Sequence, residues 1–122
     1  MAVDTLAAQE VPMRFMMFVA EDPEAEPYSA DEDNIEEWGA EVGARGVWVE
    51  GSRLRPVEDA TTVRVRDGAT VVTEGPANAA TAQIAGFDIL ECTDLAEAIE
   101  VASKHPMARF GRIELRAYWP FE

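Results

Sequence analysis

The octapeptide MRFMMFVA, residues 13–20, constrains the fold more than any other segment. Apolar side chains fill both sets of alternating positions, which is typical of a central strand covered on both faces, although periodicity alone does not separate such a strand from a short buried helix. We interpret the segment as the first strand. A sheet built on this strand needs a cover on each face, and a second subunit in a two-fold dimer can provide one of them.

A helix is predicted after this strand. Residues 29–32, SADE, have the spacing of a capping box, apolar residues recur at helical spacing over 35–42, and Gly46 is a natural helix end. A short strand over 47–54 follows. The segment 61–75 is predicted to form a hairpin because Asp67-Gly68 joins two β-branched runs.

A strand, a helix and a further strand are predicted in the second half of the chain. A strand is predicted over 84–92, and Thr93 or Asp94 caps a second helix whose buried stripe comprises Leu95, Ala98, Ile99 and Ala102. A last strand is predicted over 112–119. The order favours an α+β, ferredoxin-like domain over 13–122, with an antiparallel sheet, two helices on one face and a dimer partner on the other. Residues 1–12 are predicted to be a flexible N-terminal extension.

Charge and cysteine content limit the possible partners and compartments. The chain of 122 residues carries 24 acidic and 10 basic residues, a net charge of −14, which argues against nucleic acid or anionic membranes as partners. No apolar run reaches the roughly 20 residues of a membrane span, and the N-terminal residues lack the pattern of a secretory signal. The single cysteine, Cys92, is expected to be a buried thiol, and we predict a cytoplasmic protein.

Several motifs resemble those of the YCII-related proteins, in particular the branch named for its Asp-Gly-Pro-Phe signature. They are the hairpin TTVRVRDG, the Gly-Pro loop with Gln83 and Gly86-Phe87 after it, the helix DLAEAIE and the closing HPMARFGRIELR. The resemblance covers nearly all of residues 13–119. It implies a dimeric α+β barrel with a pocket between sheet and helices, lined by the Gly-Pro loop and by residues after the second helix.

The resemblance also implies two kinds of role. Some YCII-like members resemble enzymes that use a His/Asp pair on small organic acids, whereas many members of the signature branch are associated with extracytoplasmic-function sigma factors. This chain reads Glu74-Gly75-Pro76-Ala77 at the signature, and His105-Pro106 where the enzyme-like members have Asp-Pro. The His/Asp pair therefore does not transfer to this sequence.

The candidate site residues each have a functional and a structural interpretation. His105, the only histidine, is the candidate proton donor or acceptor, or it is only a cation suited to the end of a helix. Glu74 is the candidate base or orienting carboxylate, or a plain loop acid. The candidate ligand-binding residues are Gly75, Pro76, Arg64, Arg116 and Trp48. The arginines equally suit pairing with glutamates, and the tryptophan equally suits a core.

Two functions remain open on these grounds. The leading hypothesis is a homodimer that binds a small anionic organic molecule in a cleft bordered by Glu74–Pro76, His105 and Arg116, with His105 moving a proton in an elimination, isomerisation or hydrolysis. The alternative is a non-catalytic accessory module whose acidic helix face engages a basic protein partner such as a sigma factor. One histidine and one cysteine give no paired metal-ligand spacing, and phosphate or nucleotide motifs are not found, so no metal or cofactor is expected.

Overall fold

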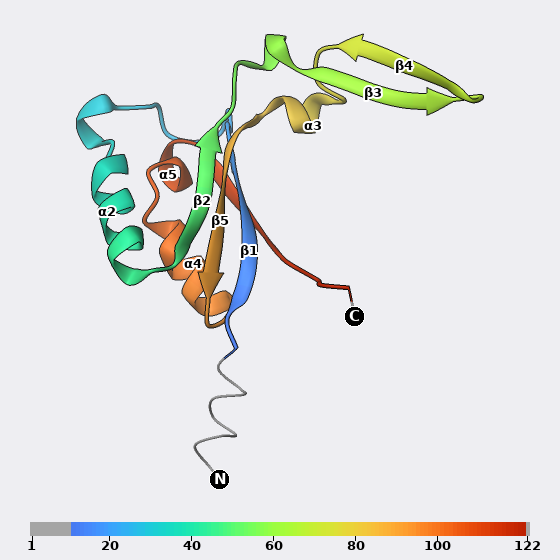
Figure 1. The fold of residues 1–122 in the computed structure, drawn as a ribbon. Helices are drawn as coiled ribbons and strands as arrows, with labels where there is room; N and C mark the ends of the chain where they lie inside the picture. Colours follow the sequence, from blue (N-terminus) through green and yellow to red (C-terminus); the bar gives the residue numbers. More distant parts are fainter. Residues whose placement is uncertain (1–10, 122) are drawn as a thin grey trace.

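The computed structural model describes residues 11–121, so nearly all of the predicted extension 1–12 lies outside the described residues. The body is a four-stranded antiparallel sheet in the order β2-β5-β1-β6 (Figure 1). Its strands are β1 (Met13–Ala20), β2 (Trp48–Arg53), β5 (Ile84–Cys92) and β6 (Arg112–Ala117). The helices α2 (Ile35–Arg45) and α4 (Leu95–Ser103) contribute to one core with the sheet. The α+β prediction with an antiparallel sheet is confirmed.

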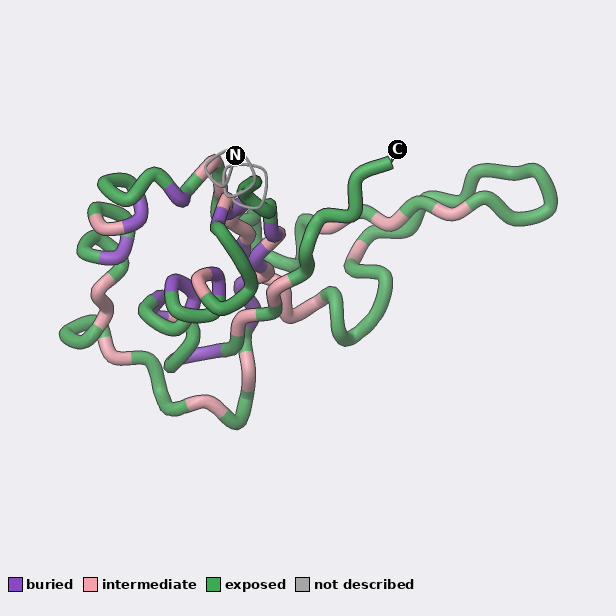
Figure 2. Tube along the Cα trace, turned by 90° about the horizontal axis from the view of Figure 1, so that it is seen from below, coloured by how far each residue is buried: buried purple, intermediate pink, exposed green. Residues whose placement is uncertain are grey.

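The central position predicted for the first strand is confirmed. β1 lies between β5 and β6, with Phe15 opposite both Leu90 and Ala117. Residues directly opposite one another in an antiparallel pair share a face of the sheet. Phe15, Met17 and Leu90 therefore point to the same side, where they are almost fully buried with Trp38 and Val101 from the helices (Figure 2).

The predicted start of the first helix is wrong. Ser29 makes no side-chain cap, residues Ala30–Glu32 form only one 3₁₀ turn, and α2 begins at Ile35. The carboxylate of Glu32 pairs with Arg109 instead of returning to the backbone of Ser29. Asp33 takes over part of the capping role, because its Oδ1 accepts the N–H of Ile35 at 3.0 Å.

The second helix is capped by the second of the two predicted residues. Asp94 Oδ1 accepts the N–H of Glu97 at 2.9 Å, and Glu97 Oε1 accepts the N–H of Thr93 at 2.8 Å. The predicted buried stripe needs correction: Leu95 and Ile99 are exposed, and the buried face runs through Ala98, Val101 and Ala102. The buried stripe is narrow and consists mostly of small side chains, and α4 lies close to the sheet along it.

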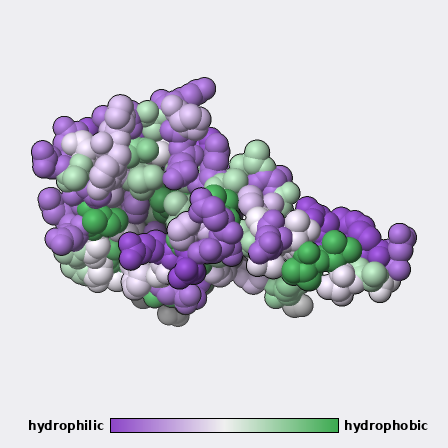
Figure 3. All heavy atoms as spheres, turned by 90° about the horizontal axis from the view of Figure 1, so that it is seen from above, coloured by the Kyte–Doolittle hydropathy of each residue, from purple (hydrophilic) through white to green (hydrophobic). Residues whose placement is uncertain are grey.

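The hairpin does not join the main sheet. β3 (Thr61–Arg66) and β4 (Ala69–Glu74) form a separate two-stranded sheet that projects from the body (Figure 1). The predicted turn is confirmed, with Asp67 and Gly68 at φ angles of 52° and 79°. We call residues 61–74 the arm. Its valines are exposed, Val63 to 62%, and Figure 3 shows apolar side chains gathered along it.

Two one-turn helices complete the described chain. α3 (Ala79–Ala82) connects the arm to β5, and α5 (Met107–Phe110) connects α4 to β6. β6 ends at Ala117, earlier than predicted, and Trp119 is 93% exposed. Among the described residues, no helix combines the length and the apolar composition that crossing a membrane requires.

Within residues 11–121, no helix covers the second face of the sheet (Figure 1). Met16 and Phe18 on β1 and Phe87 on β5 point to this open face and are only half-buried. Charged side chains, among them Glu114 and Arg116 of β6, surround this apolar centre. The sequence predicted a cover on each face of β1, and the described residues of one chain cover only one of these faces.

Candidate functional site

Two hollows meet at His105. The first, which we call the apolar cleft, has a volume of about 520 Å³ and lies between the edge of the sheet formed by β2 and β5, the start of α2 and the link from α4 to α5. Its apolar walls come from Val19, Ile35, Trp38, Trp48, Pro106 and Met107, and its polar side chains are Asp33, Ser52, Arg53, Asp88 and His105. A mostly apolar cleft with a few polar groups is the usual form of a small-molecule site.

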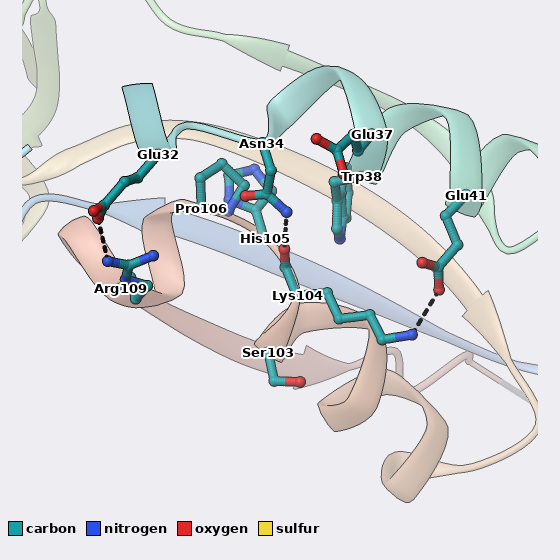
Figure 4. A pocket seen from close by; sticks show the side chains of 10 residues that line it. All are labelled: Glu32, Asn34, Glu37, Trp38, Glu41, Ser103, Lys104, His105, Pro106 and Arg109. Atoms are coloured by element: carbon teal, nitrogen blue, oxygen red, sulfur yellow. Dashed lines mark hydrogen bonds and ion pairs between the residues drawn. The ribbon is translucent and has the colours of Figure 1, made fainter. Parts of the chain in front are cut away.

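The second hollow, which we call the acidic cleft, has a volume of about 530 Å³ and lies between α2 and the end of α4 (Figure 4). Its charged groups largely neutralise one another. Lys104 Nζ lies 2.8 Å from Glu41 Oε2, and Arg109 pairs with Glu32. In Figure 4 the ring of His105 lies beside Pro106. We place the candidate site in the apolar cleft because fewer of its polar groups form ion pairs with one another than in the acidic cleft.

His105 is buried between the two clefts, with 7% of its surface exposed. The ring of Trp38 packs edge-on against it at a centroid distance of 4.7 Å. Burial disfavours the charged imidazolium and lowers the pKa of His105 to about 4, although the Asp33 carboxylate acts in the opposite direction. His105 is therefore neutral at physiological pH and is not the helix-end cation that the sequence left open.

A hydrogen bond fixes which nitrogen of His105 carries the proton. The backbone N–H of Met107 donates to Nδ1 at 3.0 Å, so Nδ1 is the acceptor and the neutral ring has its proton on Nε2. Every fully buried side-chain nitrogen or oxygen among the described residues has a hydrogen-bond partner. Nε2, for which no partner is found there, is therefore not fully buried, and its proton is available to a molecule in the clefts that His105 lines.

Asp88 is the second titratable group of the apolar cleft. Its Oδ1 accepts the indole N–H of Trp48 at 2.8 Å. Burial raises the pKa of Asp88 above its ordinary value, while the hydrogen bond from Trp48 opposes that change. A carboxyl group with a raised pKa and a neutral histidine thus line the same apolar space, which is an arrangement that suits proton transfer.

The entrance carries one cation that the sequence analysis did not single out. Arg53, at the end of β2, lines the apolar cleft and forms no ion pair with any of the described residues. A guanidinium group is well suited to bind a carboxylate or phosphate. Arg53 is thus the cation in this cleft that is available to an anionic ligand.

The structure brings only some of the predicted site residues together. His105 and Trp48 line the apolar cleft. Glu74 and Arg64 lie on the arm, and Gly75 at its base donates its N–H to Ala60 O at 2.7 Å.

Pro76 and Arg116 also lie away from the apolar cleft. Pro76 lines a different hollow of about 310 Å³ beside Leu54 and Pro56. Arg116 lies on β6 at the opposite edge of the sheet and near Glu114, at 3.9 Å. Within one chain, the predicted border of Glu74–Pro76, His105 and Arg116 does not form.

The loop and strand from Thr73 to Leu90 contribute to this cleft through their second part only. Residues 85–88 form part of the wall, whereas the Gly-Pro turn does not. Asp88 could have been found from the sequence, because it is the one acid in phase with the buried residues Gly86, Leu90 and Cys92 of the same strand. Its importance depends on which face the helices cover, and the sequence alone did not assign that face.

Cys92 and Arg45 have structural roles. Cys92 is buried as predicted, and burial raises the pKa of its thiol to about 11. Arg45 bridges α2 and α4 through ion pairs with Glu41, Glu97 and Glu100. This network fixes the two helices that frame the clefts, and no group of three or more potential metal ligands occurs among the described residues.

Comparison with known proteins gives one result. A family model described as the YCII-related domain matches residues 13–122, which include every residue that lines the apolar cleft. A search of curated proteins found no match.

Proposed function

The chain belongs to the YCII-related family, and on this premise we propose that the apolar cleft binds a small organic molecule with an anionic group. The observation that carries the proposal is His105, a buried residue that lines a mostly apolar cleft and whose Nε2–H has no partner among the described residues. Arg53 at the entrance provides the complement for a carboxylate. The aromatic walls of Trp38 and Trp48 exclude water from such a molecule.

The chemistry proposed for the cleft is acid/base catalysis. Elimination, isomerisation and hydrolysis all require a proton to move at a positioned side chain. A neutral histidine that donates from Nε2 stabilises negative charge on an oxygen without being protonated itself. His105 is the group that we assign to the stabilisation of this negative charge. The Glu74-Gly75-Pro76-Ala77 turn, which stands at the place of the signature, does not line this cleft.

We also propose that the body is a ferredoxin-like domain and that it pairs through its open face with a second copy in a dimeric barrel. The sheet order β2-β5-β1-β6 with two connecting helices on one face supports the first part. The apolar centre at Met16, Phe18 and Phe87 supports the second part, because such a surface loses contact with water when two sheets pack together.

Native mass spectrometry of the freshly purified protein tests both assembly and binding. We expect the mass of a dimer with a small molecule retained, and we expect His105→Asn to keep the dimer but lose that molecule. Asparagine places an oxygen near the Nδ1 position, so it can still accept the Met107 N–H while it removes the donor in the cleft.

Tryptophan fluorescence provides a second readout of the same prediction. Trp119→Phe removes the exposed indole, so the remaining signal comes from Trp38 and Trp48 at the cleft. Titration of this variant with benzoate and with 2-oxobutanoate is expected to change the emission, and His105→Asn is expected to weaken binding at least tenfold. No retained molecule together with no fluorescence change would contradict the proposal, and a monomer would contradict the barrel.

The alternative function, an accessory module, is favoured by one observation. Glu36 and Glu37 are exposed on α2 and form no ion pair with a described residue, whereas Glu41 is engaged by Arg45 and Lys104. Only the first two acids are available to a basic partner. A charge-reversal test at Glu41 would also disrupt the network between the helices.

We expect the double variant Glu36→Lys and Glu37→Lys to bind a labelled decalysine peptide at least tenfold more weakly if this acidic face is a docking site. The control is Glu21→Lys with Glu24→Lys, which changes the net charge equally at exposed positions elsewhere. Fluorescence anisotropy at physiological salt measures both. Equal losses in the two variants would show that only net charge matters, and the docking face on α2 would be rejected.

A further inference from the structure

Asp88 is an unusual residue for its place in the sheet. It lies on β5 between Gly86 and Leu90, on the face that the helices cover, opposite Met17 of β1. A carboxylate on the covered face of a central region of a sheet loses water, which destabilises its charged form. An apolar side chain at this position would pack on the core without that cost. The residue is therefore a candidate for a function that packing does not explain.

Two neighbours on β2 accommodate the Asp88 carboxyl group. Trp48 donates its indole N–H to Oδ1 at 2.8 Å. Gly51 is opposite Asp88 in the register, and a Cβ atom built on this glycine would overlap both Asp88 Oδ1 and the backbone oxygen of Phe87. Any larger residue at position 51 would displace the carboxyl group, so the backbone leaves space for it and the indole orients it.

The second carboxyl oxygen is available to a ligand. Oδ2 has no hydrogen-bond partner among the described residues, and none of their fully buried side-chain oxygens lacks one, so Oδ2 is accessible. Asp88 lines the apolar cleft, and so does His105. A carboxyl oxygen and an N–H donor without partners among the described residues thus belong to two side chains that line the same cleft.

We infer that Asp88 is the group that exchanges a proton with a ligand in the apolar cleft, that Trp48 positions it, and that His105 holds the ligand's oxygen through Nε2–H. This inference rests on the proposed function, because it assigns the acid/base work of the same cleft. It narrows the substrate class to small carbonyl compounds with a C–H bond next to the carbonyl group.

The step balances without a co-reactant. The Asp88 carboxylate removes a proton from the carbon next to the carbonyl, and the electron pair of that C–H bond forms a carbon–carbon double bond. The carbonyl oxygen gains the negative charge and accepts the hydrogen bond from His105. In a substrate with a carbon–carbon double bond beyond that carbon, return of the proton from Asp88 to the far carbon of this double bond re-forms the carbonyl group, gives the conjugated isomer and restores the carboxylate.

The charges around the cleft fit these roles. The titratable and charged side chains that line it besides Asp88 are Asp33, Arg53 and His105. Desolvation raises the pKa of Asp88 toward the range in which a carboxylate is an effective base, and His105 stays neutral. Trp48 donates to the ionised form and so limits the increase. Loss of this donor alone must therefore raise the pKa further.

Carbon-13 NMR of the aspartate carboxyl groups in the full chain tests the assignment without a ligand. Asp88→Asn identifies the Asp88 signal, and we expect that signal to titrate above the ordinary value of about 3.9. Trp48→Phe is expected to raise the midpoint further, by roughly one pH unit for the loss of one hydrogen bond to a charged group. Trp38→Phe is the matched control, because its indole donates to Val101 O and not to Asp88.

Hydrogen–deuterium exchange of 3-oxobutanoate at the carbon between its carbonyl groups tests the proton transfer. We expect the wild-type protein to accelerate exchange, Asp88→Asn to lose at least 100-fold of that acceleration, and Trp48→Phe to shift the pH profile upward with the Asp88 midpoint. Asparagine at 88 keeps the acceptor for the Trp48 N–H, so a loss of exchange in this variant is not caused by a change in the fold. Nitrogen-15 NMR reports whether His105 is protonated at Nε2.

Each outcome decides one part of the inference. An Asp88 midpoint at or below the ordinary value, or one that Trp48→Phe leaves unchanged, would overturn the positioned acid/base group. A His105 protonated at Nδ1 would overturn its role as donor, and wild-type exchange equal to that in buffer would overturn the proton transfer. If Asp88 titrates as expected while neither benzoate nor 2-oxobutanoate binds, the proposed function fails and the Asp88–Trp48 assignment survives.

Discussion

Trp38→Ala is expected to lower the free energy of unfolding by about 3–5 kcal/mol, the range for truncating a large core aromatic residue. Trp38 is 5% exposed and joins three parts of the molecule. Its side chain extends from α2 into the hydrophobic core, its ring contacts His105, and its Nε1–H donates to Val101 O of α4 at 2.9 Å. Removal of the ring leaves a cavity between the helices and deletes one of the two hydrogen bonds that Val101 O accepts, while the N–H of Lys104 still donates to it at 3.2 Å.

Two variants separate the contributions of Trp38. Trp38→Phe retains most of the ring against His105 but loses the hydrogen bond to Val101, and we expect it to cost about 1–3 kcal/mol. Trp119→Phe is the surface control and should change stability by less than about 0.5 kcal/mol. Urea unfolding followed by circular dichroism measures all three. A Trp38→Ala variant within about 1 kcal/mol of wild type would contradict the role assigned to this side chain.

Lowering the pH from 7 to 4.5 is expected to destabilise the wild-type protein by about 2.5 kcal/mol more than it destabilises His105→Asn. The sign follows from the two states of the histidine. In the unfolded chain His105 takes up a proton near pH 6.5, whereas burial lowers its pKa to about 4 in the folded protein. Between these values the unfolded state binds more protons, so stability falls as the pH falls.

In the comparison with His105→Asn, the contributions of the other groups that titrate in acid cancel. Glu41, Glu97 and Glu100 have lowered pKa values because they pair with Arg45 and Lys104 or accept hydrogen bonds from Thr93, and their contributions are lost as the pH falls. They titrate equally in both proteins. Urea unfolding at a series of pH values gives the difference. The same pH slope in both proteins would mean that His105 is not buried in its neutral form.

Local patterns were sufficient for most elements of the body. The apolar run of residues 13–20 predicted the central strand, the Asp67-Gly68 turn predicted the hairpin, and Asp94 was one of two predicted caps of the second helix. These features depend on the period of side chains along the chain and on backbone conformations that few residues adopt. They need no knowledge of distant contacts.

Local patterns misplaced elements where a distant partner competed. Glu32 has the spacing of a capping residue, but Arg109 from the other end of the chain binds its carboxylate, and α2 begins at Ile35. The hairpin was predicted as part of one sheet, yet it forms a separate arm. Nothing in the sequence of a strand states which edge it pairs with, because every strand offers the same backbone groups.

The sequence by itself determined the strands of the body, its two main helices and the choice of His105 as a candidate. Only the tertiary structure decided that His105 lines one cleft with Asp88 and Trp48, while Glu74 and Arg64 lie on the arm and Arg116 on the far edge strand. The physical reason lies in the order of the strands. The pairing of β2 with β5 brings Trp48 and Gly51 to Asp88, and the helices on that face bury the histidine beside them.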